Sequence, residues 1–364
     1  MNSENNIKKI LIPLPNKVYK GGICSYWSAI FSSFKKISDV EFEVVKIGNR
    51  GKNIFGPLLD QWKFHKASSG IDLVILNPSV QNRAFPREGL LAKQLIAKKI
   101  PFMAFFHGWD LEFEKKVTER YTKFFQNSYG HAEKIITLSP EAKEKIIEWG
   151  YKGEVIVETT VVDSTLVEDF SFETRSKDSN FSKKIKILFL ARMEVEKGIY
   201  ELIEAFNELH AEFNHIELVL AGNGTAYEEI KDYVKNMNAI SLLGHVEGEG
   251  KAKAFKESDI YCLPSYSEGL PVSVLEAMAF SLPIVTTSVG GLKYFFKEEM
   301  GYTAIPQDSN DLKDKLKSLI VDHSAMKRMG KFNFDYAQEH LMSDSIVSRL
   351  HKHLIDEVQE EAVF

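Results

Sequence analysis

The sequence predicts an α/β protein built from two doubly wound domains in tandem, and three observations support this. Short apolar runs alternate with helical patterns along the whole chain, which is typical of parallel sheets covered by helices on both faces. A polar stretch rich in serine and lysine, 171–184, interrupts the alternation, which then restarts. The chain has 364 residues, and a length of this order favours two hydrophobic cores over one.

The first domain is predicted over residues 1–165 and is followed by a linker over 166–184. Segments 89–99 and 141–149 have helical patterns. Strands are expected at the short apolar runs 9–15, 42–48, 72–79, 101–108, 134–139 and 154–162.

The second domain is predicted over residues 185–342. Beyond it, apolar residues recur every four positions, which predicts an amphipathic helix over 343–364; these residues are Ile346, Leu350, Leu354 and Val358. Strands of the second domain are expected at 185–192, 216–222, 240–244, 259–265, 283–290 and 302–306.

Composition favours a cytoplasmic protein. Cys24 and Cys262 lie far apart without a CxxC pair, which argues against a disulfide framework or a cysteine-based zinc site. We see no signal-peptide pattern, and no apolar run approaches the roughly 20 residues of a membrane span. Residues 1–163 contain 24 Lys and Arg against 18 Asp and Glu, whereas residues 164–364 contain 22 Lys and Arg against 33 Asp and Glu. The whole chain therefore has a net charge of −5. Either two solvated surfaces differ by chance, or the basic half meets an anionic partner such as a membrane or a phosphorylated acceptor.

The stretch SEGLPVSVLE, residues 267–276, places two glutamates eight positions apart. Pro271 suits a first helical turn, so we expect a helix over 271–280, with Glu268 in the preceding loop and Glu276 in the second turn. The positive helix end binds phosphate readily, and the carboxylates then accept hydrogen bonds from hydroxyl groups. A nucleotide sugar fits this pattern, although the motif taken alone favours the simpler explanation of a helix cap and a surface glutamate. The free amides would be those of Gly269, Leu270, Val272 and Ser273.

Two further motifs end strands of the second domain. ARMEVEKG, residues 191–198, contains Arg192 and Lys197, which could neutralise a diphosphate or be two surface cations. Gly290 and Gly291 allow close backbone approach to a ligand or form an ordinary tight turn. LAGNGTAY, residues 220–227, is a weak signal for a nicotinamide cofactor because the fingerprint's third glycine and acidic residue are absent.

The first domain contains two motifs of the same kind. Gly21 and Gly22 lie between a predicted strand and helix, where they approach a phosphate or turn the chain. His107 and Asp110 end another strand, although a lone histidine is commonly structural. The remaining histidines show no spacing typical of metal ligands.

Together these motifs resemble the retaining glycosyltransferases of family 4, which have the GT-B fold and include sucrose synthase-like and bacterial polysaccharide enzymes. Glu268 and Glu276 match the family's Glu-x7-Glu signature, within a closely matching stretch at 264–291. ARMEVEKG resembles its Arg-x-x-x-Glu-Lys-Gly element and Gly21-Gly22 its glycine loop. The resemblance covers most of residues 8–340 and is weaker in the first half.

The resemblance implies two Rossmann-like domains facing a central cleft, with the C-terminal helix crossing back to the first domain. By position, Arg192 and Lys197 would hold the donor diphosphate, and Glu276 would accept from the ribose hydroxyls. Glu268 would bind the transferred sugar, and His107 would contact that sugar from the first domain. The other donor-binding residues would be Gly21, Gly22, Gly222, Gly269, Leu270, Pro271 and Val272, with His245 and Val246 at the base.

The implied activity is that of a retaining, metal-independent hexosyltransferase. It would move a sugar from a UDP-sugar, or as second option a GDP-sugar, to a glycan or lipid-linked hydroxyl in cell-surface polysaccharide biosynthesis. We expect no cofactor, no nucleic-acid partner, and peripheral contact with the anionic inner face of the membrane. The chain departs from the family pattern at Tyr294, where an acidic residue is usual, and at 158–163. A GT-B epimerase, a sugar phosphorylase and a non-catalytic nucleotide-sugar binding module remain alternatives.

Overall fold

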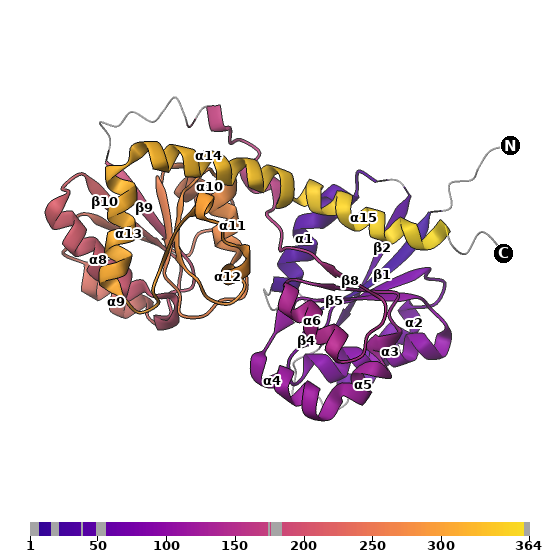
Figure 1. The fold of residues 1–364 in the computed structure, drawn as a ribbon. Coiled ribbons are helices and arrows are strands. Elements are labelled where there is room, and N and C mark those ends of the chain that lie inside the picture. Colours follow the sequence, from indigo (N-terminus) through magenta and orange to yellow (C-terminus); the bar gives the residue numbers. More distant parts are fainter. Residues whose placement is uncertain are drawn as a thin grey trace. The chain divides into compact units, whose positions relative to one another are not determined.

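The computed structural model describes residues 7–15, 22–37, 39–48, 56–173, 175 and 184–359. The chain divides into two compact units, Met1–Thr160 and Val161–Phe364, and each contains a six-stranded sheet flanked by helices (Figure 1). The predicted alternation of strands and helices is therefore confirmed in both halves. The linker over 166–184 and the assignment of the C-terminal helix to the first domain stay predictions, and residues 176–183 lie outside the described residues.

The first unit's sheet is parallel, with strand order β2-β1-β3-β5-β7-β8. Two predicted strands, 72–79 and 101–108, each divide into a sheet strand and a short second strand. These short strands, β4 (Ser79–Val80) and β6 (Gly108–Trp109), pair with each other. The sheet strands are β1 (Lys8–Pro15), β2 (Val40–Ile47), β3 (Leu73–Leu76), β5 (Phe102–Phe106), β7 (Lys134–Thr137) and β8 (Glu154–Val157).

Local sequence explains how two of the first unit's helices begin. Asp110 accepts from the Phe113 amide at the start of α4, and Ser139 accepts from the Ala142 amide at the start of α6. Pro140 then occupies the first turn of α6, where no amide donor is needed. The helices are α1 (Gly22–Phe34), α2 (Gly56–Ala67), α3 (Ala84–Lys98), α4 (Leu111–Lys116), η1 (Val117–Tyr121), α5 (Thr122–Gln126), η2 (Tyr129–His131) and α6 (Pro140–Glu148).

The second unit's sheet is also parallel, with order β11-β10-β9-β12-β13-β14. From β9 the chain adds strands first on one side and then, starting with β12, on the other. This reversal creates a switch point at the carboxyl ends of β9 and β12, where open α/β sheets bind ligands. The strands are β9 (Ile185–Leu190), β10 (Ile216–Ala221), β11 (Ile240–Gly244), β12 (Ile260–Leu263), β13 (Ile284–Thr287) and β14 (Gly301–Ala304).

The second unit's helices enclose its core and continue to the end of the described chain. The predicted C-terminal helix is confirmed over Ser343–Gln359 as α15, in which Ile346, Leu350 and Leu354 are buried. The Val358 side chain and residues 360–364 lie outside the described residues. Among the described residues, no helix has the length and apolar character needed to cross a membrane. The helices are η3 (Ser164–Val167), η4 (Val195–Lys197), α8 (Ile199–Glu212), α9 (Tyr227–Val234), α10 (Gly248–Lys256), α11 (Val272–Ala279), α12 (Leu292–Phe295), η5 (Glu298–Met300), α13 (Ser309–Val321), α14 (His323–His340) and α15 (Ser343–Gln359).

Candidate functional site

The switch point of the second sheet brings Lys197 and Glu268 together. Lys197 ends η4, after β9, and Glu268 lies in the loop between β12 and α11. The Lys197 ammonium donates to Glu268 Oε1 at 2.5 Å, and the Ser265 hydroxyl donates to the same oxygen at 2.7 Å. The Lys197 and Glu268 side chains are only 14% and 10% exposed, so this is a largely dehydrated pair of opposite charges at a strand end.

Two glycines after β13 support the Glu268 loop. Gly290 has a φ of 53°, and a Cβ there would lie 1.7 Å from the carbonyl oxygen of Glu268. The Gly291 amide donates to the Gly269 carbonyl at 2.8 Å. The close backbone approach that the sequence indicated is therefore made to the chain's own loop, which these contacts hold in place.

Helix α11 begins one residue later than predicted. Pro271 has a φ of −71° and a ψ of 120°, so it is extended and occupies the cap position, and Val272 is the first helical residue. Glu268 is confirmed in the loop and Glu276 in the second turn. Within the part of the chain that the structure describes, four amides at this helix end donate no hydrogen bond, namely those of Gly269, Leu270, Val272 and Ser273.

Glu276 is buried and paired with a residue that the sequence did not single out. Lys251, on α10, donates to Glu276 Oε1 at 2.5 Å, and the Glu276 side chain is 7% exposed. Burial raises the pKa of Glu276, while the Lys251 charge opposes this rise and Asp163 adds to it. Lys251 is one of three lysines on α10, and nothing in their spacing distinguishes it.

A buried tyrosine lies close to both glutamates. The Tyr261 hydroxyl is 3.0 Å from the Leu190 carbonyl oxygen and 2.7 Å from the Ser273 hydroxyl oxygen. Burial raises the pKa of Tyr261 well above its usual value, and the charges of Glu276 and Glu268 contribute to the rise. The structure thus places both glutamates of SEGLPVSVLE within electrostatic reach of one side chain.

The loop after β9 is held against the loop after β10. Glu194 accepts hydrogen bonds from the Thr225 hydroxyl and amide, and these lower its pKa together with the positive charges of Arg192 and Lys197. Arg192 is exposed, and its charge, like that of Lys197, acts on Glu194. Gly222 has a φ of 141°, and a Cβ there would lie 1.8 Å from the Ala191 carbonyl oxygen. This backbone packing explains the glycine without a nicotinamide cofactor.

Three remaining predicted positions of the second unit lie near the same edge of the sheet. His245 follows β11, is exposed and has Nε2 2.9 Å from Glu247 Oε1, and Val246 packs against the core. Tyr294 lies on α12, is 51% exposed and has the Lys293 ammonium 5.4 Å from its ring centre. Tyr294 therefore presents a phenol to solvent where the resembling family usually has a carboxylate.

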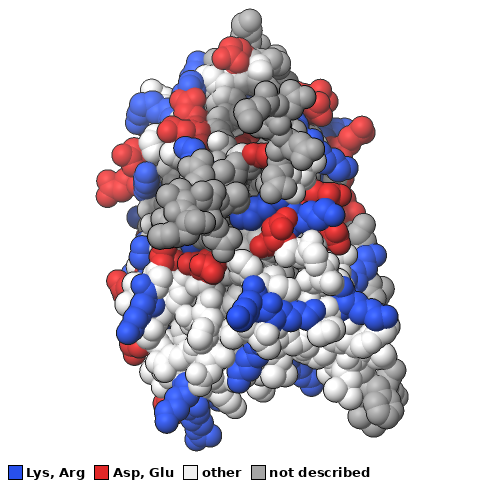
Figure 2. Space-filling model, turned by 90° about the vertical axis from the view of Figure 1, so that its right-hand side faces the viewer, with Lys and Arg blue, Asp and Glu red and all other residues white. Residues whose placement is uncertain are grey.

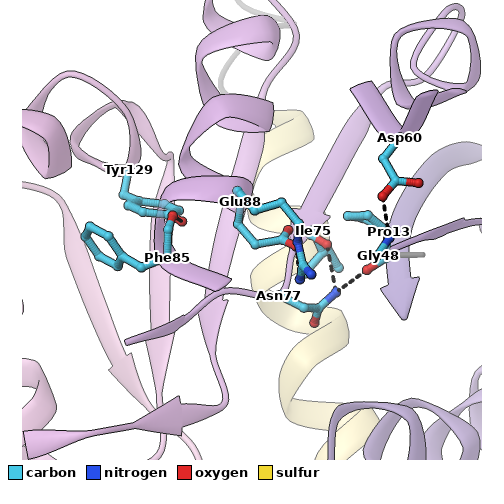
Figure 3. Close-up of polar contacts among 9 residues, drawn as sticks. Pro13, Gly48, Asp60, Ile75, Asn77, Phe85, Glu88 and Tyr129 are labelled. Carbon is cyan, nitrogen blue, oxygen red and sulfur yellow. Dashed lines mark hydrogen bonds and ion pairs between the residues drawn. The ribbon is translucent and has the colours of Figure 1, made fainter. Parts of the chain in front are cut away.

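In the first unit, His107 follows β5 and is fixed by Asn77, which follows β3. His107 Nε2 lies 3.0 Å from Asn77 Oδ1, and its ring stacks on Phe105. Figure 3 shows the Asn77 amide group donating to the carbonyls of Pro13 and Ile75, both at 3.2 Å. These two bonds orient Oδ1 as an acceptor, so Nε2 of His107 carries the proton and Nδ1 can accept one.

Burial lowers the pKa of His107 to about 3, so the imidazole is neutral at physiological pH. Asn77 directly follows the buried run LVIL, and a polar residue after an apolar run is a signal by which the sequence could have identified it. Gly22 begins α1, and Gly21 lies outside the described residues. Among the described residues, no three His, Cys, Asp or Glu side chains are grouped as metal ligands.

We expect His107 to remain neutral from pH 5 to pH 8, because burial disfavours the imidazolium ion. Nitrogen-15 NMR of labelled histidine, assigned with His107→Gln, would show an Nε2-protonated ring without titration. In Asn77→Asp the new carboxylate should raise the pKa of His107, so that titration enters or approaches this range. A wild-type titration near pH 6.5 would contradict the geometry.

Comparisons with known proteins agree on the fold and on a class of enzymes. Residues 171–335 match the sequence model of "Glycosyl transferases group 1". An uncharacterized glycosyltransferase of Methanocaldococcus jannaschii is 27% identical over 359 residues, covering 92% of this chain and 94% of the relative. The amylovoran biosynthesis glycosyltransferase AmsK of Erwinia amylovora is 25% identical to this chain. The match covers 61% of this chain and 56% of the AmsK sequence.

Two solved structures illustrate the structural likeness. HepE of Anabaena, solved with UDP and glucose, superposes with a TM-score of 0.70 at 16% identity, covering 96% of this chain and 100% of its own. Sucrose-phosphate synthase of Thermosynechococcus elongatus superposes with a TM-score of 0.68 at 17% identity, covering 96% of this chain and 100% of the synthase chain. The chain therefore has the GT-B fold, and its residues 171–335 carry the sequence pattern of the group 1 glycosyl transferases.

Proposed function

We propose that this protein is a retaining glycosyltransferase of family 4, which moves a sugar from a nucleotide-diphosphate donor to a hydroxyl acceptor. The observation that carries the proposal is the pairing of Lys197 with Glu268 at the switch point between β9 and β12. A cation, a carboxylate and unbonded helix-end amides meet there, and a sugar diphosphate needs these groups. The match of residues 171–335 to glycosyl transferases supports the same activity.

In the proposed reaction, the bond between the anomeric carbon and the diphosphate oxygen breaks, and its electron pair goes to the phosphate. The acceptor hydroxyl attacks from the same face, and its proton passes to the departing phosphate oxygen. Arg192, Lys197 and the amides before α11 stabilise the charge that develops on the diphosphate, which is electrostatic catalysis without a metal. Glu268 accepts hydrogen bonds from hydroxyls of the transferred sugar, and Glu276 accepts hydrogen bonds from the ribose hydroxyls. The neutral His107 side chain contacts the donor sugar.

The proposed donor is a UDP-sugar and the proposed acceptor a glycan or lipid-linked hydroxyl in polysaccharide biosynthesis. The names of AmsK and of HepE with UDP and glucose support this choice. We further propose a cytoplasmic location with peripheral contact at the inner face of the membrane. The excess of cations in residues 1–163 supports that contact.

A panel of nucleotide sugars, incubated with the protein without an acceptor, tests the proposal. We expect slow hydrolysis of one UDP-sugar, with release of UDP and free sugar and no effect of a chelator. Release of GDP would correct the base. A new epimer without UDP release would indicate an epimerase, dependence on inorganic phosphate a phosphorylase, and binding without turnover a binding module. The absence of both binding and turnover across the panel would contradict the proposal.

A further inference from the structure

Helix α2 of the first unit presents large apolar side chains to solvent. Leu58, Leu59 and Trp62 are 68%, 46% and 54% exposed. At about 100° per residue, these three positions span roughly 100° of the helix circumference. The opposite side buries Phe64 in the core, so the unit's own core does not account for the outward apolar residues.

The exposed charges on α2 and α3 have one sign. Helices α2 and α3 each contain one carboxylate, Asp60 and Glu88, and these are only 7% and 2% exposed. Asp60 accepts from the Gly48 amide at 2.7 Å (Figure 3), and Glu88 pairs with Arg87 at 2.9 Å. Cations remain at the surface on the two helices and their ends, among them Lys63, Lys66, Arg83, Lys93 and Lys99.

The two helices form one continuous surface. Gln94 hydrogen-bonds Gln61, and Lys98 donates to the His65 carbonyl at 2.5 Å and to the Ser68 hydroxyl at 2.9 Å. Leu90 on α3 adds a further apolar side chain that is 49% exposed. The lower part of Figure 2 shows Lys and Arg scattered over largely uncharged surface, seen from the side where α2 appears in Figure 1. The α2–α3 face is defined by Leu58, Leu59, Trp62, Lys63, Lys66, Leu90 and Lys93.

A cation lies beside an aromatic ring at the centre of the face. The Lys66 ammonium lies 4.1 Å from the centre of the Trp62 ring, so an amphipathic aromatic ring and a long cationic side chain stand beside each other. Helix α4 offers a contrast within the same unit. Its Leu111 is 70% exposed but is accompanied by both acidic and basic residues.

We propose that the α2–α3 face docks on an anionic phospholipid bilayer. Leu58, Leu59 and Trp62 enter the headgroup region, and the lysines contact lipid phosphates, as interfacial helices do. This deepens the peripheral contact proposed above by assigning its surface. A nucleic acid or an acidic protein would use the cations alone, whereas the bilayer interface also buries the aliphatic side chains.

Tryptophan fluorescence tests the proposal because Trp62 is the most exposed of the four tryptophans. Trp27 and Trp149 are 1% exposed, and Trp109 is partly buried. We expect vesicles of phosphatidylglycerol and phosphatidylcholine to shift the emission to the blue, and brominated lipids to quench it. Trp62→Phe should lose this response, pure phosphatidylcholine should not produce it, and rising salt should weaken it.

Two variants separate the contributions of the face in vesicle flotation. Leu58→Ser/Leu59→Ser/Trp62→Ser should reduce partition at least tenfold. Lys63→Glu/Lys66→Glu should reduce it more than the roughly fivefold that one lysine contributes near an anionic surface. Lys115→Glu/Lys116→Glu on α4 is the matched control and should bind like the wild type. Melting temperatures check that each variant is folded.

The proposal is overturned if the folded wild type fails to bind anionic vesicles, if the triple variant binds equally well, or if the α4 control loses as much. Binding to heparin or DNA without Trp62 quenching by vesicles would point to a soluble polyanion and would also overturn it. Donor hydrolysis in vesicle-free solution should be the same in all variants. If the protein binds vesicles but hydrolyses no donor, the glycosyltransferase proposal is contradicted and the docking surface is still supported.

Discussion

Lys197→Ala is expected to lower donor turnover about 10²–10³-fold, which is the usual effect of removing one group that stabilises a developing negative charge. The Lys197 ammonium lies at the switch point, is largely shielded from water and is oriented by Glu268 at 2.5 Å. Without it, the proposed diphosphate would keep only Arg192 and the helix-end amides. Turnover with the best donor of the panel is the measurement.

A second variant distinguishes loss of the cation from loss of Glu268's partner. Lys197→Ala leaves a poorly solvated carboxylate without its counter-charge, which destabilises the fold. Lys197→Ala/Glu268→Gln removes that charge and should recover stability in thermal unfolding, while its turnover stays well below that of Glu268→Gln alone. Turnover equal to that of Glu268→Gln would show that Lys197 serves only to neutralise Glu268. Turnover equal to the wild type in Lys197→Ala would refute the role altogether, and Lys231→Ala, at an exposed position of α9, is the control.

Glu276→Gln is expected to weaken nucleotide binding about ten- to a hundredfold, because hydrogen bonds to an ionised group are stronger than those to a neutral amide. The neutral side chain should also leave Lys251 without its counter-charge. Isothermal titration calorimetry with the nucleotide identified by the panel is the measurement. Glu249→Gln, on the same α10 helix as Lys251 and exposed, should bind normally. An unchanged dissociation constant in Glu276→Gln would count against the ribose contact.

The affinity for the nucleotide should fall at low pH, because protonation of Glu276 removes the carboxylate acceptor. Burial raises the pKa of Glu276, so the carboxylate acceptor is lost as the pH falls through that raised value. Lys251→Met removes the charge that opposes the rise and should move the loss of affinity to higher pH. Glu276→Gln should remove this part of the pH dependence.

Much of the fold could be predicted because local sequence encodes it. Apolar runs located the strands of both sheets, and the sequence preceding α11 located Glu268 in a loop and Glu276 in the helix. The error at Pro271 was one residue, because proline fixes φ but leaves ψ free to be extended. The division of 72–79 and 101–108 was missed because β4 and β6 form only by pairing with each other.

The sequence by itself determined the tandem α/β architecture and nominated the polar residues at strand ends, since both follow from periodicity and residue type. Only the tertiary structure joined Lys197 to Glu268 across 71 positions, Lys251 to Glu276, and Asn77 to His107. It also buried Asp60 and Glu88 and so left one sign of charge on the α2–α3 face. The physical reason is that these contacts depend on strand order and helix packing, which bring distant segments together and which no local pattern encodes.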